Sequence, residues 1–205
     1  KEHALVEPDD RILMAVSGGV DSMVMMHLFV TAGYKVGVAH CNFQLRGGES
    51  DEDEVLVEER AASYGIPFFN RRFDTHGEME ITGESVQIAA RRLRYNWFKE
   101  LSEEHNYDAI AIAHHADDSI ETFFINLLRG TGLKGLTGIH RVNGKVIRPL
   151  LFASRREILD YATAHKIPFR EDSSHRSTKY MRNKIRLGID PMLRDINPNF
   201  TQRTG

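Results

Sequence analysis

Short apolar runs and longer amphipathic patterns alternate along most of this chain. The short runs predict buried strands at 11–16, 35–40, 66–72 and 108–113. Apolar residues with helical spacing predict helices at 22–32, 50–64, 85–105, 118–129 and 154–166. Strands that alternate with helices form a mainly parallel sheet with helices on both faces. The pattern therefore predicts an α/β fold with an open, doubly wound sheet.

We expect two units along the chain. Residues 1–150 contain the predicted strands and would form an α/β domain, and residues 151–205 would form a helical extension of it. The sequence stops without a capping element, so we expect further domains to follow.

The composition narrows the class of protein. The 205 residues carry a net charge of −2, so a nucleic acid would have to bind to a local basic surface. The single cysteine, Cys41, excludes internal disulfides and thiolate zinc sites. No apolar run approaches the ~20 residues of a membrane span, and no secretory signal opens the chain. We expect a cytoplasmic protein without a membrane partner.

Polar motifs follow three of the four predicted strands directly. They are 17–22 (Ser-Gly-Gly-Val-Asp-Ser), 40–42 (His-Cys-Asn) and 114–118 (His-His-Ala-Asp-Asp). Ligands of open parallel sheets bind at the carboxyl ends of the strands. We therefore expect these motifs to meet in one site.

The 17–22 loop has the features of a phosphate cradle. Adjacent glycines let an anion approach the backbone closely, and the following helix directs its N–H groups and positive dipole end toward the loop. The loop has no Walker lysine. Asp21 among phosphates would orient the loop or contact a metal ion. The alternative is an ordinary turn in which Asp21 and Ser22 cap the helix.

Residues 114–122 combine two histidines with three carboxylates. Asp118 and Glu121 have the spacing of a capping box, which is the simpler interpretation. Carboxylate oxygens also suit Mg²⁺, which binds few protein carboxylates together with substrate phosphates. Zinc on His114, His115 and an acid is the rival, although neighbouring strand residues point in opposite directions.

Several cationic segments are candidates for contacts with an acidic substrate. We expect Ser50 to cap a helix behind Arg46, which would then be a mobile clamp beside the phosphate loop. We expect a polar loop at 73–84, a second glycine-rich loop at 128–136, and a hairpin with an Asn-Gly turn at 141–149. Arg182 and Arg186 are four residues apart on one predicted helical face.

The 17–22 loop resembles the P-loop of ATP pyrophosphatases, which split ATP into AMP and pyrophosphate. Further motifs resemble the tRNA(Ile)-lysidine synthetases in order, from about residue 11 to 200. They lie at 40–51, 83–91, 114–122, 128–136, 148–151 and 172–186. His175 stands where the family would lead us to expect Asn. The resemblance covers a catalytic domain, so C-terminal tRNA-recognition domains are expected beyond it.

This resemblance implies an ATP- and Mg²⁺-dependent ligase. ATP would adenylate the position-2 oxygen of the wobble cytidine in an isoleucine tRNA with a CAU anticodon. The side-chain amine of L-lysine would then displace AMP. We also consider a second copy of the chain as a partner, which would form a homodimer.

The resemblance also implies roles for individual residues. Asp21, His114, Asp118, Glu121 and Arg186 would be catalytic, and Asp21 and Asp118 would bind Mg²⁺. ATP would contact Ser17, Gly18, Gly19, Asp21, Ser22, Ala39, His40 and Arg94. The tRNA would contact Arg46, Arg182 and Arg186.

Other functions stay open at this point. A tRNA thiolase with the same loop would need catalytic cysteines, and only Cys41 is present. An amidotransferase-type synthetase would need a source of ammonia. A nucleotide-binding module that does not turn over its ligand would not need the catalytic carboxylates or the arginines that contact the tRNA.

Overall fold

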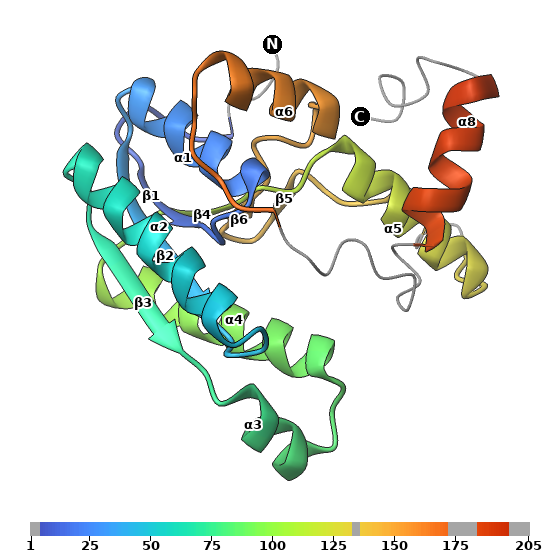
Figure 1. The fold of residues 1–205 in the computed structure, drawn as a ribbon, viewed down its shortest axis with the longest axis horizontal. Helices are drawn as coiled ribbons and strands as arrows, with labels where there is room; N and C mark the ends of the chain where they lie inside the picture. The colour runs from blue at the N-terminus through green and yellow to red at the C-terminus, as the bar shows by residue number, and fades with distance from the viewer. Residues whose placement is uncertain (1–4, 133–135, 172–183, 197–205) are drawn as a thin grey trace.

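The structure is a computed structural model that describes residues 5–132, 136–171 and 184–196. A six-stranded sheet forms its centre, with the order β3-β2-β1-β4-β6-β5 (Figure 1). The strands are β1 (Arg11–Ala15), β2 (Lys35–Asn42), β3 (Phe68–Arg72), β4 (Ala109–Ile112), β5 (Val142–Asn143) and β6 (Val146–Ile147). All neighbours are parallel except β5 and β6. This confirms the mostly parallel sheet that the alternating pattern predicts.

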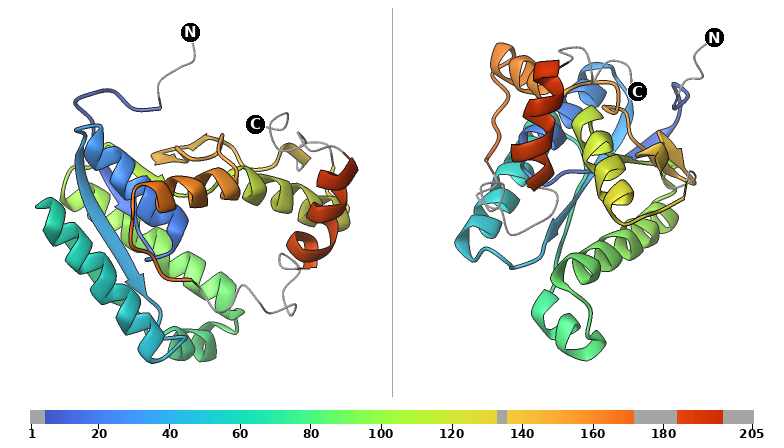
Figure 2. Two further views of the ribbon diagram at one scale, coloured as in Figure 1. Left: turned by 45° about the horizontal axis from the view of Figure 1, so that its top comes forward. Right: turned by 90° about the vertical axis from the view of Figure 1, so that its right-hand side faces the viewer.

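Helices cover both faces of this sheet. They are α1 (Val20–Thr31), α2 (Gly48–Tyr64), α3 (Thr75–Thr82), α4 (Val86–Glu104), α5 (Ala116–Leu128) and α6 (Arg155–Ala164), followed by the π-helical turn η3 (Ile185–Ile189) and by α8 (Asp190–Ile196). In both views of Figure 2, α8 lies beside α5, and the turn η3 that leads into α8 contacts α5. In the part of the chain that the structure describes, no helix combines the length and apolar character needed to cross a membrane.

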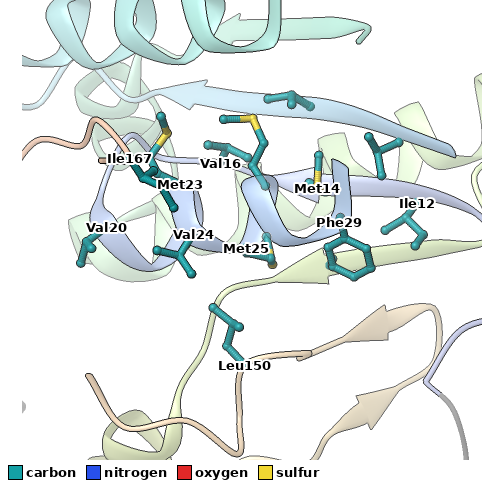
Figure 3. Close-up of a cluster of buried hydrophobic side chains, with 14 of the residues drawn as sticks. Ile12, Met14, Val16, Val20, Met23, Val24, Met25, Phe29, Leu150 and Ile167 are labelled. Carbon is teal, nitrogen blue, oxygen red and sulfur yellow. The ribbon is translucent and has the colours of Figure 1, made fainter. Parts of the chain in front are cut away.

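The alternation of side chains along β1 explains why helices pack on both faces of the sheet. Ile12 and Met14 are fully buried in a cluster with residues of α1, α2 and α6 (Figure 3). Leu13 points to the other face, where it packs with Trp97 and Phe98 of α4. Successive strand residues face opposite sides, so one apolar strand supports both layers. The fold is therefore doubly wound.

Helix α6, the first helix after residue 150, shares the core of the preceding residues. Its residues Ile158 and Ala162 are buried in the same cluster as Ile12 of β1. The capping box predicted at Ser154 is present: Ser154 N donates to Glu157 Oε2 at 2.8 Å, and Glu157 N donates to Ser154 Oγ at 3.3 Å. The division of the chain at residue 150 stays a prediction.

Two local predictions need correction. The segment 73–84 is not a loop throughout, because α3 occupies its middle. Asp74 caps this helix by accepting from Gly77 N at 2.9 Å, and Gly83 ends it with a φ of +69°. The hairpin at 141–149 is confirmed, but Gly144 and Lys145 form its turn, since Asn143 already pairs with Val146.

Candidate active site

The carboxyl ends of β2, β1 and β4 lie side by side, because these strands are adjacent in the sheet. The 17–22 loop follows β1, the His40 motif ends β2, and the 114–118 motif follows β4. The expectation that the three motifs share one edge of the sheet is confirmed.

The 17–22 loop is held by its own serines. Ser22 Oγ donates to Gly19 O at 2.9 Å and accepts from Ser17 N at 3.1 Å. Gly18 has a φ of +92°, which favours glycine. The N-cap of α1 is Gly19, so the simpler interpretation of Asp21 and Ser22 as caps is wrong. The first N–H groups of α1 point toward the loop, as an anion site requires.

Three carboxylates surround one buried histidine at the start of α5. His115 Nε2 lies 3.4 Å from Asp118 Oδ2 and 3.9 Å from Asp21 Oδ2, and its Nδ1 lies 3.4 Å from Asp117 Oδ2. Burial alone would lower the pKa of the His115 ring. The surrounding carboxylates outweigh burial and raise this pKa, so they favour the imidazolium form. We expected His114 to be the catalytic histidine, and no local signal in the sequence distinguishes it from His115.

Asp118 has a second, structural role. Its Oδ2 accepts from His115 N at 3.0 Å, which makes it the acid of a capping box with His115 as the N-cap. The predicted box started at Asp118 itself and is wrong by three residues, because α5 begins at Ala116. The carboxylate thus helps to fix the helix start that carries the site.

Asp21 is oriented from the opposite side by α6. Arg155 Nη1 donates to Asp21 Oδ2 at 3.1 Å, and Arg155 N donates to Asp117 Oδ2 at 2.7 Å. Among the described residues, the buried Asp21 Oδ1 has no hydrogen-bond partner. In the same part of the chain, no group of three or more His, Cys, Asp or Glu residues is arranged to hold a metal ion alone.

Glu121 and Arg186 form a buried ion pair one turn further along α5. Arg186 Nε donates to Glu121 Oε1 at 2.6 Å, and Glu121 is only 2% exposed. Arg186 therefore joins the acidic cluster, although it comes from η3 near the end of the chain. Arg182, its predicted neighbour, lies outside the described residues.

The two other histidines have different partners. His114 Nδ1 accepts from Arg148 Nε at 3.1 Å, so the sequence-adjacent histidines do not share a ligand position. His40 Nδ1 donates to Val16 O at 2.8 Å. Burial lowers the pKa of His40, which keeps its ring neutral at pH 7. Ala39 is buried against α4, and Ala39 O accepts from Val16 N at 3.0 Å. The contact of this segment with adenosine stays a prediction.

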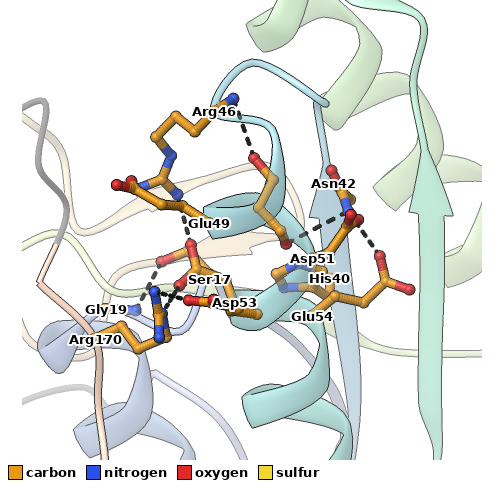
Figure 4. A network of polar contacts seen from close by, with 12 residues as sticks. Ser17, Gly19, His40, Asn42, Arg46, Glu49, Asp51, Asp53, Glu54 and Arg170 are labelled. Carbon is orange, nitrogen blue, oxygen red and sulfur yellow. Dashed lines mark hydrogen bonds and ion pairs between the residues drawn. The ribbon is translucent and has the colours of Figure 1, made fainter.

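Arg46 pairs with a carboxylate of α2 in this structure, and its predicted role as a clamp stays a prediction. Its Nη2 donates to the buried Asp53 Oδ2 at 2.6 Å (Figure 4). Ser50 does not cap α2, because the helix begins at Gly48 with Gly47 as N-cap, and Ser50 Oγ instead accepts from Arg46 N at 3.3 Å. The helix therefore begins two residues before the predicted start at Ser50.

The other cations are spread over several partners. The guanidinium of Arg94 lies over the Phe43 ring, 5.2 Å from its centroid, near the end of β2. Lys145 and Arg148 of the hairpin are used internally, since Lys145 donates to Tyr107 O at 2.9 Å and Arg148 donates to His140 O at 2.6 Å. Their contact with an acidic polymer stays a prediction.

Solved structures of other proteins have the same fold. The U34-tRNA thiolase NcsA from Methanococcus maripaludis, described with its [4Fe-4S] cluster, has a TM-score of 0.80 and 19% identity, over 98% of this chain and 71% of that one. The NH3-dependent NAD synthetase from Campylobacter jejuni has a TM-score of 0.56 and 14% identity, over 97% of this chain and 83% of that one. At these identities the likeness shows the fold alone.

Sequence relatives are considerably more similar. The tRNA(Ile)-lysidine synthase of Bacteroides thetaiotaomicron is 46% identical over 199 residues, which are 97% of this chain and 46% of that protein. The enzyme of the same name from Chlorobaculum tepidum is 44% identical over 195 residues, 93% of this chain and 59% of that protein. This chain thus spans about half the length of these curated relatives. The family model of the PP-loop domain matches residues 2–193. The chain therefore belongs to the PP-loop domain family.

Proposed function

We propose that this chain is the catalytic part of a ligase that attaches lysine to the wobble cytidine of an isoleucine tRNA with a CAU anticodon. Curated relatives named tRNA(Ile)-lysidine synthase support this proposal, and so does the PP-loop family, which implies ATP binding. A tRNA substrate would place the enzyme in the cytoplasm.

One observation carries the proposal: a phosphate-binding loop and a set of buried carboxylates lie at the same sheet edge. The loop suits the pyrophosphate end of ATP. The carboxylates Asp21, Asp118 and Glu121 suit a cation and an ammonium group, because they are buried or nearly so and lie close to the loop. Lysine ligation needs both kinds of site in one place.

The chemistry needs no protein nucleophile. The position-2 oxygen of cytidine attacks the α-phosphorus of ATP, and pyrophosphate leaves. The lysine side-chain amine then attacks carbon 2, and AMP leaves with the former carbonyl oxygen while the nitrogen loses a proton. Adenylation turns a poor leaving group into a good one, so the protein contributes positioning and charge neutralisation.

The two steps of this reaction assign a role to each candidate residue. Ser17, Gly18, Gly19 and Ser22 hold the phosphates, and the Ala39–His40 segment and Arg94 contact the rest of ATP. Glu121 attracts the lysine ammonium, and His114 helps to organise the reacting centre. Arg46, Arg182 and Arg186 contact the tRNA.

The residues present fit a magnesium ion. Asp21 Oδ1 is a buried carboxylate oxygen that lacks a hydrogen-bond partner among the described residues, and Asp118 approaches the same His115 ring. Asp21 and Asp118 would hold the ion together with ATP oxygens, as Mg²⁺ prefers. Bound there, the ion would neutralise phosphate charge.

A tRNA thiolase is the second candidate, because the NcsA thiolase has the same fold. Sulfur transfer by this chain would depend on Cys41, its one cysteine. Burial raises the pKa of the Cys41 thiol to about 12, which makes it a poor nucleophile. The thiolase reading is therefore disfavoured.

The test is the formation of AMP and pyrophosphate that depends on both tRNA and lysine, measured with the full-length enzyme. We expect Asp118→Asn to abolish lysine incorporation while the fold is retained. Asp160→Asn is the matched control, because Asp160 lies on the exposed side of α6 and pairs only weakly with Arg156 at 3.8 Å. Near-normal activity of the Asp118→Asn enzyme would remove Asp118 from the site.

A further inference from the structure

A buried carboxylate on α2 joins two arginines from distant parts of the chain. Asp53 Oδ2 accepts from Arg46 Nη2 at 2.6 Å, and Asp53 Oδ1 accepts from Arg170 Nε at 2.9 Å. The Asp53 side chain is 8% exposed, whereas those of Arg46 and Arg170 are 30% and 38% exposed. The acid is thus the inner member of the group, and both guanidinium groups reach solvent.

This group lies directly against the phosphate loop. A Cβ atom added to Gly18 would lie 3.4 Å from the Cβ of Asp53, which is van der Waals contact, so the loop packs directly on this acid. Arg170 N also donates to Gly18 O at 3.0 Å. Figure 4 shows Asp53 between the two arginines, with Ser17 and Gly19 beside it. The segment that follows α6 is therefore joined to the loop through the backbone of Arg170 and to Asp53 of α2 through the Arg170 side chain.

The chemistry of arginine suits a second ligand at this position. A guanidinium carries five N–H donors in a planar fork, so one edge can bind a carboxylate while another binds a phosphate. The exposed partner of Arg170, Glu52, lies at the surface with 62% of its side chain exposed, where an ion pair contributes little. A phosphate beside the loop would compete easily with such a partner, whereas Asp53 is held in place by burial.

We propose that Asp53 is a positioning residue for the nucleotide site: it holds Arg46 and Arg170 beside the 17–22 loop, where their guanidinium groups bind the β- and γ-phosphates of ATP. This inference rests on the proposed function, because it assigns the loop to ATP. Arg170 thereby becomes a nucleotide contact, and Arg46 acts on ATP rather than on tRNA alone.

The test compares the binding of ATP and AMP in the presence of Mg²⁺, by titration calorimetry on this chain. Asp53→Asn preserves the size of the side chain and removes its charge. We expect the dissociation constant of ATP to rise about tenfold and that of AMP to change little, because AMP lacks the β- and γ-phosphates. Glu52→Gln is the matched control, since it removes the exposed acid from the same arginine, and should change ATP binding by less than about twofold.

A purely structural role would give a different result. If Asp53→Asn weakens ATP and AMP equally, or leaves the preference for ATP unchanged, the inference is wrong. Thermal unfolding of each variant reports stability separately. If Asp53→Asn does not fold, Arg170→Ala serves instead: it removes a partly exposed side chain, and an unchanged preference for ATP would refute the proposal. A wild-type chain that binds no ATP would overturn the proposed function itself.

Discussion

The reactivity of Cys41 provides a quantitative test that separates the two candidate enzymes. Only the thiolate of a cysteine is an effective nucleophile. Burial raises the pKa of this thiol from 9.0 to about 12, although the charges of Arg94 and Arg71 act to lower it. At pH 8 the thiolate fraction should therefore be about a thousandfold smaller than that of an ordinary thiol.

The assay is alkylation by iodoacetamide, followed by mass spectrometry. Cys41 is the only cysteine, so the rate reports on this residue alone. The same chain unfolded in guanidinium chloride supplies the reference rate. We expect alkylation of the folded chain to be slower by about two to three orders of magnitude, with a rate that still rises with pH above 9. A folded-state rate within about tenfold of the reference would refute the assignment of a buried, protonated thiol.

The same residue tests the function. Under the ligase proposal Cys41 carries no step, so Cys41→Ser in the full-length enzyme should retain lysine incorporation. Under the thiolase alternative the same substitution should abolish the modification of tRNA. If the Cys41→Ser variant loses all tRNA modification while its unfolding temperature is unchanged, the result would favour the thiolase.

Three further predictions concern the scaffold and the site. Glu54 accepts hydrogen bonds from Asn42, Asn70 and Arg72. Burial acts to raise the pKa of Glu54, but these contacts outweigh burial and lower it. The ionised Glu54 therefore stabilises the fold above the unfolded pKa near 4.5, and this stabilisation is lost as the pH falls through the lower folded pKa. Urea unfolding should show that Glu54→Gln costs about 1 to 3 kcal/mol at pH 7, with the difference shrinking below pH 4, and a pH-independent cost would contradict this. Gly37→Ala should destabilise the chain by about 1 to 3 kcal/mol or more, because the new Cβ would lie 2.0 Å from the Tyr107 hydroxyl; unchanged thermal stability would show that the sheet adapts there. Arg186→Ala should cost about 3 kcal/mol by leaving the Glu121 charge buried, and the double variant with Glu121→Gln should recover part of this loss; strictly additive costs would argue against the pair.

Local signals predicted the strands, most helices and the sheet edge that carries the site. Strand periodicity and the capping box at Ser154 depend on neighbours within a few residues, so the sequence alone was sufficient. The helix α3 was missed because Gly77 interrupts its pattern, although Asp74 and Gly83 marked both ends. An acid that can cap a helix start, followed nine residues later by a glycine that can end it, is the sequence signal that predicts this helix.

The partners of the site residues were less accessible to prediction. Asp53 and Arg170 are separated by 117 positions, and their contact exists only because α2 and the segment after α6 converge on the same loop. Likewise, which of His114 and His115 turns inward depends on the exact start of α5, and that start was predicted two residues late. Tertiary packing decides such contacts, and residue type alone does not.

The order of the strands places two clusters of paired charges on opposite sides of the 17–22 loop, an arrangement that the motifs do not contain individually. β1 lies between β2 and β4, so α1 begins between the helices that follow those two strands. On the β2 side, Asp53 gathers Arg46 and Arg170 beside the loop. On the β4 side, Asp118 and the Glu121 carboxylate lie at the start of α5. Under the proposed function, the arginine side would draw the triphosphate, and the acidic side would draw the cation and the lysine ammonium. Under the same function, the reacting cytidine would be activated between them, at the N-terminus of α1.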